Sequence, residues 1–273
     1  MNVTATARVI PGRAGFRHAL RMEWIKLRSL RSTRLTLLVA AVGTVGIAVA
    51  VLGSYKSEHF AQMTAQQRES FDPTNMGYAG TIVAMIALGV LGVLTVTGEY
   101  SSGMIRATLG AVPGRGRMLL AKATVFGAVA LVVGELVVLA NFLAGEAVLT
   151  SAAPHASLGD PAVLRSVLLT GAFLALLGLV GLGLGTIIRH TAGAITAFIG
   201  GLFALPMIVL MAGGESIFDT VGKFVPMLID ENSVGAVKPV AGALSPWAGL
   251  AMMCLYAILA LGAGGWLLLR RDA

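Results

Sequence analysis

Six stretches of the sequence are apolar enough and long enough to cross a lipid bilayer as helices. A helix rises about 1.5 Å per residue, so about 20 apolar residues cover the roughly 30 Å of hydrocarbon. The chain of 273 residues is 56% hydrophobic and 12% charged, whereas a soluble domain has roughly a quarter charged residues. This composition excludes a water-soluble globule and predicts an all-α polytopic membrane protein. The predicted spans are Leu35–Gly53, Tyr78–Gly98, Ala123–Leu143, Leu168–Ile188, Ala192–Gly213 and Trp247–Leu269.

The basic residues predict the orientation of these spans, because Lys and Arg are retained on the cytoplasmic side. With the N-terminus inside, 15 of the 20 Lys and Arg fall in cytoplasmic segments and five fall outside. The sequence therefore predicts a multi-pass protein of the plasma membrane with both termini in the cytoplasm. It divides into a cytoplasmic leader over residues 1–34 and a six-span domain over residues 35–273. The net charge of +7 flanks the spans, which favours contact with membrane lipid and argues against nucleic acid binding.

The chain lacks the residue patterns that metal binding and catalysis require. Cys254 is its only cysteine, and its four histidines lie in separate segments without ligand spacing. There is no G-x-x-x-x-G-K-[ST] phosphate loop, since the one Gly-Lys pair, Gly222-Lys223, is followed by Phe224. We expect no metal site and no catalytic residues in this chain, and any ATP hydrolysis would take place in another protein.

The leader carries an apolar face at helical spacing, which predicts an interfacial amphipathic helix on the inner membrane surface. A simple membrane anchor is the alternative interpretation. Glu23 falls within the apolar face, where an unpaired carboxylate would be costly, and Lys26 at i+3 is the nearest partner. The apolar face consists of Phe16, Ala19, Leu20, Trp24, Leu27 and Leu30.

The segment between the second and third spans is too long for a simple hairpin. We expect a cytoplasmic helix over Glu99–Leu109, which Val112-Pro113-Gly114 ends before two basic residues, Arg115 and Arg117. Such a protrusion suits docking of another protein, although a basic loop that only sets the topology is the alternative. The residues of this segment that form an apolar ridge are Tyr100, Met104, Ile105 and Leu109, and its charges are Glu99 and Arg106.

This segment resembles the signature of the bacterial ATP-binding-cassette (ABC) transporter permeases of the type-two, exporter-like family. The matching residues are Glu99, Tyr100, Gly103, Ile105, Arg106, Thr108, Leu109, Pro113 and Lys122, whereas Gly116 departs from the pattern and leaves the post-proline arginine ambiguous between Arg115 and Arg117. The leader segment Glu23–Ser32 and the end of the chain from Leu244 to Ala273 resemble the same family.

The resemblance implies a permease that pairs with a second membrane half, usually a copy of itself, and with two cytoplasmic ABC ATPase subunits that bind ATP and magnesium. It also implies export, here of an amphipathic or drug-like substrate, and a coupling helix after the second span that is seated on the ATPase. The residues that it assigns to coupling are Glu99, Tyr100, Gly103, Ile105, Arg106, Arg115 and Arg117, beside an interfacial helix with Glu23, Trp24 and Lys26.

Glu135 is the only acidic residue well inside a predicted span. We expect it to face the protein interior or a dimer cavity and to be protonated or hydrogen-bonded, because a charge near the bilayer centre is costly. A secondary transporter or channel without an ATPase is the alternative function, but one carboxylate makes a poor ion relay. An intramembrane enzyme would need paired carboxylates, a Ser with a His, or a zinc motif, and none is present.

Two helix-packing features and one loop complete the pattern. Gly181-x-x-x-Gly185 allows close helix approach, which favours packing within the chain over a dimer contact. Pro206 predicts a kink in the fifth span, because it lacks the backbone N–H. The outside loop over Glu215–Pro246 is too polar to span, and we expect it to lie at or dip into the outer leaflet.

Overall fold

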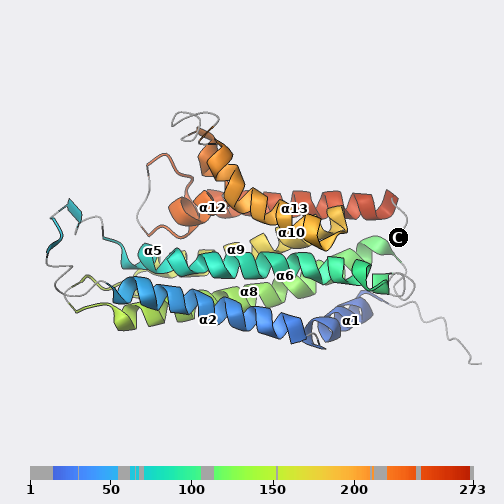
Figure 1. Ribbon diagram of the computed structural model, residues 1–273, viewed down its shortest axis with the longest axis horizontal. Helices are drawn as coiled ribbons and strands as arrows, with labels where there is room; N and C mark the ends of the chain where they lie inside the picture. The colour runs from blue at the N-terminus through green and yellow to red at the C-terminus, as the bar shows by residue number, and fades with distance from the viewer. Residues whose placement is uncertain are drawn as a thin grey trace, which may run out of the picture.

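The computed structural model describes residues 15–29, 31–54, 62–64, 66–67, 71–105, 114–151, 153–209, 211, 220–237 and 241–270. These residues form helices joined by turns and contain no strand. Helix α1 (Phe16–Ser29) precedes a bundle of long helices that run roughly alongside one another (Figure 1).

Six helices of the described part are long and apolar enough to cross a membrane, which confirms the predicted number of spans. In the described residues between the fifth and sixth spans lie the short helices η3 (Gly222–Phe224), α12 (Pro226–Ile229) and η4 (Asp230–Val234). The six spans are α2 (Arg31–Gly53); the continuous α5 (Pro73–Gly77), η1 (Tyr78–Gly80) and α6 (Thr81–Ser101); α8 (Arg115–Val148); α9 (Pro161–Ile188); α10 (Thr191–Ile199) with η2 (Gly200–Ala204), continuing to Val209; and α13 (Pro246–Arg270).

Helix α9 lies at the centre of the bundle, with α6, α8 and α13 packed around it. In the most apolar stretch of α9, 67% of the residues are buried, and in that of the α6 span 61% are. The corresponding share is 22% in α2 and α13 and 17% in the α10 span. The outer helices therefore keep wide apolar faces that the chain itself does not cover. A bilayer or a partner must cover these faces.

Glycines allow α9 to approach α6 and α13 closely. A Cβ added at Gly181 would collide with the carbonyl oxygen of Gly89 on α6, and one at Gly92 would collide with that of Gly178 on α9. On the other side of α9, a Cβ at Gly183 would lie 2.6 Å from the Cβ of Ala260 on α13. The glycine pattern around Gly181 thus packs helices within the chain, as the sequence favoured.

Several helices begin earlier than the apolar runs predicted. α8 begins at Arg115 and not at Ala123, and α9 begins at Pro161 and not at Leu168. Asp160 caps α9, because its Oδ1 accepts a hydrogen bond from the Ala162 N–H at 2.8 Å and Pro161 has no N–H to satisfy. The hydropathy criterion excluded the basic first turn of α8 and the part of α9 before Leu168, which contains Arg165 and Ser166, although both continue the same helices.

The fifth span departs from regular α-helix just before Pro206. The five residues Gly200–Ala204 form a π-helix, and the helix resumes at Leu205. A proline ring clashes with the carbonyl four residues earlier, here Leu202, and a π-turn widens the helix at that point. The predicted disruption at Pro206 is confirmed, and its form is a π-turn.

Candidate functional site

The candidate site lies at the end of the bundle where α1 packs against α8 and where α6 ends and α8 begins. We call this the basic end. It also holds the end of α9 and the end of α13, since Arg189 donates a hydrogen bond to the Leu267 carbonyl at 3.4 Å. The residues that the sequence singled out for coupling lie here.

Four charged side chains from three helices form a closed cluster at the basic end. Lys122 of α8 lies 2.6 Å from Glu23 Oε2 on α1 and 2.7 Å from Glu99 Oε1 on α6. Lys26 of α1 lies 3.1 Å from Glu23 Oε1 and 2.9 Å from Glu99 Oε1. Each carboxylate thus contacts both ammonium groups, and the cluster of Glu23, Lys26, Glu99 and Lys122 is formally neutral.

The charge cluster is largely shielded from solvent. The Lys122 side chain is 2% exposed, Glu23 3% and Glu99 9%, while Lys26 at 21% lies at the edge. Burial of a lone charge would cost several kcal/mol, so each side chain here depends on the others. The Glu23 to Lys26 pair is the one that helical spacing predicted, and its membership in a larger cluster was not predicted.

A cavity of about 600 Å³ adjoins the charge cluster between α1, α2, α6 and α8. Its charged wall consists of the cluster itself. Its other walls are mostly apolar and include Leu27, Leu91, Leu94 and Met104. A cavity with a charged wall and apolar walls suits a molecule that has a polar part and an apolar part.

The connection from α6 to α8 differs from the helix predicted over Glu99–Leu109. Glu99 and Tyr100 belong to the last turn of α6, which ends at Ser101. Gly103 then adopts φ +70, a left-handed conformation that glycine adopts without strain, and Met104 and Ile105 are helical again. The prediction of one helix starting at Glu99 is therefore wrong at its start. Arg106 lies outside the described residues.

The side chains of this connection divide into buried and exposed ones. Glu99 faces the charge cluster, and Ile105 is 5% exposed beside Met118 and Leu268. Neither side chain presents itself to a partner in this structure. Among the described residues of the connection, the exposed ones are Ser101, Ser102, Gly103 and Met104, followed by Gly114 and Arg117.

Tyr100 and Arg115 tie the connection to α9 and α13. The guanidinium of Arg189, at the end of α9, lies 5.3 Å from the centre of the Tyr100 ring, a cation–π distance. Arg115 donates a hydrogen bond from Nη1 to the Leu268 carbonyl at 3.0 Å. Arg115, in the first turn of α8, thus holds the end of α13, and its predicted contact with a partner stays a prediction.

Helix α1 forms where the leader pattern predicted it, and only part of the predicted apolar face is buried. Ala19, Glu23 and Leu27 are buried, while Phe16 and Trp24 are 41% and 49% exposed. The spacing of four residues places the buried three on one helix face against α8. The exposed apolar side chains leave a surface that a membrane interface would cover, so the interfacial role stays a prediction.

Glu135 is half-buried in α8. Its carboxylate lies against the backbone of α9, because a Cβ added at Gly171 would meet the Glu135 Cδ at 2.5 Å. The side chain therefore contacts a neighbouring helix of the same chain. Its protonation state and any role in transport stay predictions.

The sequence reasoning did not assign three residues that the structure makes prominent. Lys122 was noted only as part of the family pattern, and Arg189 was given no role of its own. Asp230 was only one acid in an outside loop, although it is 3% exposed. The position of Lys122 at the start of an apolar run could have indicated its role, since a lysine buried there needs a carboxylate partner.

The fold and this site define a polytopic helical membrane protein. It has a buried charge cluster at the basic end, beside the exposed part of the α6–α8 connection. The family model described as ABC-2 family transporter protein matches residues 19–203, and the chain belongs to this family. No curated protein matches it. The chain is accordingly a permease component of an ABC transporter, and membership implies association with ABC ATPase subunits.

Proposed function

We propose that this chain is the membrane subunit of an ABC exporter, driven by a separate ATPase that docks at the basic end. The proposed orientation places the basic end and both termini in the cytoplasm and the spans in the plasma membrane. The excess of Lys and Arg at this end supports that orientation. ATP and magnesium would bind to the ATPase, because this chain has no phosphate loop.

The charge cluster is the observation that carries the proposal. The residues just after Glu99 form the exposed part of the α6–α8 connection, so an ATPase that contacts Ser102, Gly103 and Met104 would act one turn from the cluster. The four ion pairs hold the end of α6, the start of α8 and α1 together. A displacement of the connection would therefore move these three helices as one unit.

The roles of the predicted coupling residues follow from their positions. Gly103, Met104 and Arg117 are exposed and available for docking. Glu99, Tyr100, Ile105 and Arg115 contact other helices of the chain, so they would transmit the movement. Arg106 keeps its proposed contact with an ATPase carboxylate, for which a guanidinium offers bidentate geometry.

The proposed substrate is amphipathic, which the cavity beside the charge cluster supports. Its charged wall and its apolar walls match a molecule with a polar head and an apolar body. Its place between α1 and α2, near the proposed inner leaflet, would allow entry from the membrane. A second copy of the chain would cover the exposed faces of α2, α10 and α13, with lipid covering the rest.

The test is to purify the tagged permease from its native membranes with its bound subunits and to measure ATP hydrolysis and its stimulation by substrate. Met104→Cys in a Cys254→Ser background should form a crosslink to the ATPase. Glu99→Gln combined with Lys122→Met, which leaves Glu23 and Lys26 as a neutral pair, should preserve assembly and reduce stimulated hydrolysis. Glu146→Gln, which affects the contact of Glu146 with the His155 ring between α8 and α9, is the matched control and should leave stimulated hydrolysis unchanged. A permease that purifies with no ATP-hydrolysing subunit would refute the proposal.

A further inference from the structure

A second cavity lies at the opposite end of the bundle and has no part in the proposed coupling. It has a volume of about 430 Å³ and is enclosed by the end of α2, by α5 to α6 and by the short helices α12 and η4. Most of its wall is apolar, with Val51, Ile82, Met85 and Met227 among its residues. We call it the Asp230 cavity after the acid in its wall.

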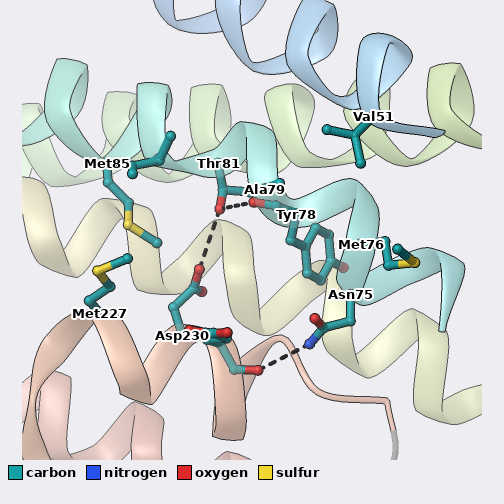
Figure 2. A pocket seen from close by; sticks show the side chains of 11 residues that line it. Val51, Asn75, Met76, Tyr78, Ala79, Thr81, Met85, Met227 and Asp230 are labelled. Atoms are coloured by element: carbon teal, nitrogen blue, oxygen red, sulfur yellow. Dashed lines mark hydrogen bonds between the residues drawn. The ribbon is translucent and has the colours of Figure 1, made fainter. Parts of the chain in front are cut away.

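The Asp230 carboxylate is buried without adequate hydrogen-bond donors. Its side chain points toward Thr81, with Met85 and Met227 on one side (Figure 2). Oδ2 lies 3.5 Å from the Thr81 hydroxyl, but that hydroxyl donates its one hydrogen to the Tyr78 carbonyl at 2.6 Å. No described residue donates to Oδ1. Buried side-chain polar atoms normally have at least one hydrogen-bond partner, so this carboxylate lacks partners that a ligand can supply.

The surrounding contacts hold the Asp230 cavity in shape. Asn75 of α5 donates to the Glu231 carbonyl at 3.2 Å (Figure 2), which fixes η4 to the wall opposite. Ser166 of α9 donates to the Gly235 carbonyl at 2.6 Å, and its hydroxyl lies 3.0 Å from the Tyr78 hydroxyl. These hydrogen bonds fix the segment that carries Asp230, and none of them is made to the Asp230 carboxylate.

The charges around Asp230 favour a positive ligand. The described residues that line the cavity include two acids, Asp230 and the exposed Glu231, and no Lys, Arg or His. Arg165 on α9 directs its Nη2 to the Ala236 and Val237 carbonyls at 3.0 and 3.4 Å. The Arg165 guanidinium therefore bonds to backbone carbonyls of the segment after η4.

We propose that the Asp230 cavity binds an amphipathic organic cation, whose ammonium group pairs with Asp230 and whose apolar part lies against Met85 and Met227. The ammonium would supply the donors that the carboxylate lacks. The flexible, polarisable methionine side chains accommodate apolar groups of varied shape. This inference goes beyond the proposed function, since binding requires no ATPase.

The test uses the full-length permease in nanodiscs of neutral phosphatidylcholine, without any ATPase. The probes are 1-naphthylmethylammonium and its neutral analogue 1-naphthylmethanol, measured by equilibrium dialysis against empty nanodiscs. At pH 8 we expect saturable binding of the cation, weakened about thirty-fold or more in Asp230→Asn, since a buried charge pair is lost. Binding of the neutral probe should be equal in both proteins, which also shows that the variant is folded.

Glu231→Gln is the control for the adjacent acid. Because Glu231 is exposed, its loss should weaken cation binding less than about three-fold. Equal affinity for the two probes, no saturable cation binding, or unchanged affinity in Asp230→Asn would each overturn the proposal. None of these outcomes would contradict the proposed ATPase-driven function, because that function is tested separately by ATP hydrolysis.

A measurement on the unaltered protein gives a second test. The pKa of Asp230 is raised to about 7, mainly because burial disfavours the charged carboxylate; Thr81 lowers the pKa and the charge of Glu231 raises it, and both effects are smaller. Only the ionised carboxylate pairs with a cation, so cation affinity should rise about ten-fold between pH 6 and pH 8. Among the described residues that line the cavity, the other titratable groups are Tyr78 and Glu231. Cation affinity that is flat over this range would contradict the pairing.

Discussion

The ammonium of Lys122 lies 2.6 Å from Oε2 of Glu23, and 99 positions of the chain separate these two residues. The contact joins the helix before the first span to the start of the third. Since Lys122 also contacts Glu99 at 2.7 Å, a single buried ammonium links three helices. Displacement of any one of these helices would break an ion pair in a place that water reaches poorly.

Lys122→Met should be strongly destabilising, because it leaves two carboxylates with one ammonium in a buried site. Loss of one partner from a buried ion pair costs about 3 to 5 kcal/mol. Adding Glu99→Gln to Lys122→Met should restore much of the loss, since Glu23 and Lys26 remain as a neutral pair. Thermal unfolding in detergent measures both effects. Strictly additive losses in the double variant would contradict the cluster.

Gly181→Ala should disrupt the packing of α9 on α6, because its methyl group would collide with the Gly89 carbonyl oxygen. Backbone cannot move aside cheaply, so we expect a loss of about 2 kcal/mol or more. Gly262→Ala is the matched control, since no atom lies within 4 Å of its added Cβ. Unfolding midpoints in detergent should fall for the first variant only. A similar midpoint for both would mean that the two helices are not closely packed.

The number of spans could be predicted because each apolar run exceeds the length that a bilayer requires. Helix starts were predicted less well, since Arg115 and Arg165 lie inside helices but ahead of the apolar runs from which the starts were predicted. Their guanidinium groups donate to carbonyl oxygens of other segments, which makes a basic residue stable there. Hydropathy alone does not predict these hydrogen bonds, so it does not predict where the helices begin.

The site could be predicted only in its local part. The pairing of Glu23 with Lys26 follows from the spacing of a helix, so it was predicted and is confirmed. The contacts of Glu99 with Lys122 and the burial of Asp230 depend on how distant helices pack, and a single sequence does not specify that. The family pattern marked Glu99 and Lys122 without indicating that the two residues touch.

Labelling of introduced cysteines tests the orientation. In a Cys254→Ser background, Ser102→Cys at the basic end should react with a membrane-impermeant maleimide only after the cells are opened. Ser157→Cys, in the exposed connection before α9, should react in intact cells. The excess of Lys and Arg at the basic end is the physical reason. The reverse labelling pattern would place the basic end outside and would exclude docking of a cytoplasmic ATPase there.

Asp230→Asn should stabilise the protein in a pH-dependent way. The pKa of Asp230 is about 7 in the folded protein, whereas an aspartate in an unfolded chain has a pKa of about 3.9. Between these values the unfolded chain has released its proton while the folded protein retains it, so the stability of the unaltered protein falls as pH rises from about 4 to 7. Asparagine does not titrate and avoids this loss.

At about 1.4 kcal/mol per unit of pKa, the free energy of unfolding of the variant should exceed that of the unaltered protein by a few kcal/mol at pH 8 and by much less at pH 5. Unfolding midpoints in detergent at these two pH values, with Glu231→Gln as the exposed control, decide the matter. A gain of equal size at both would show that burial does not perturb this carboxylate.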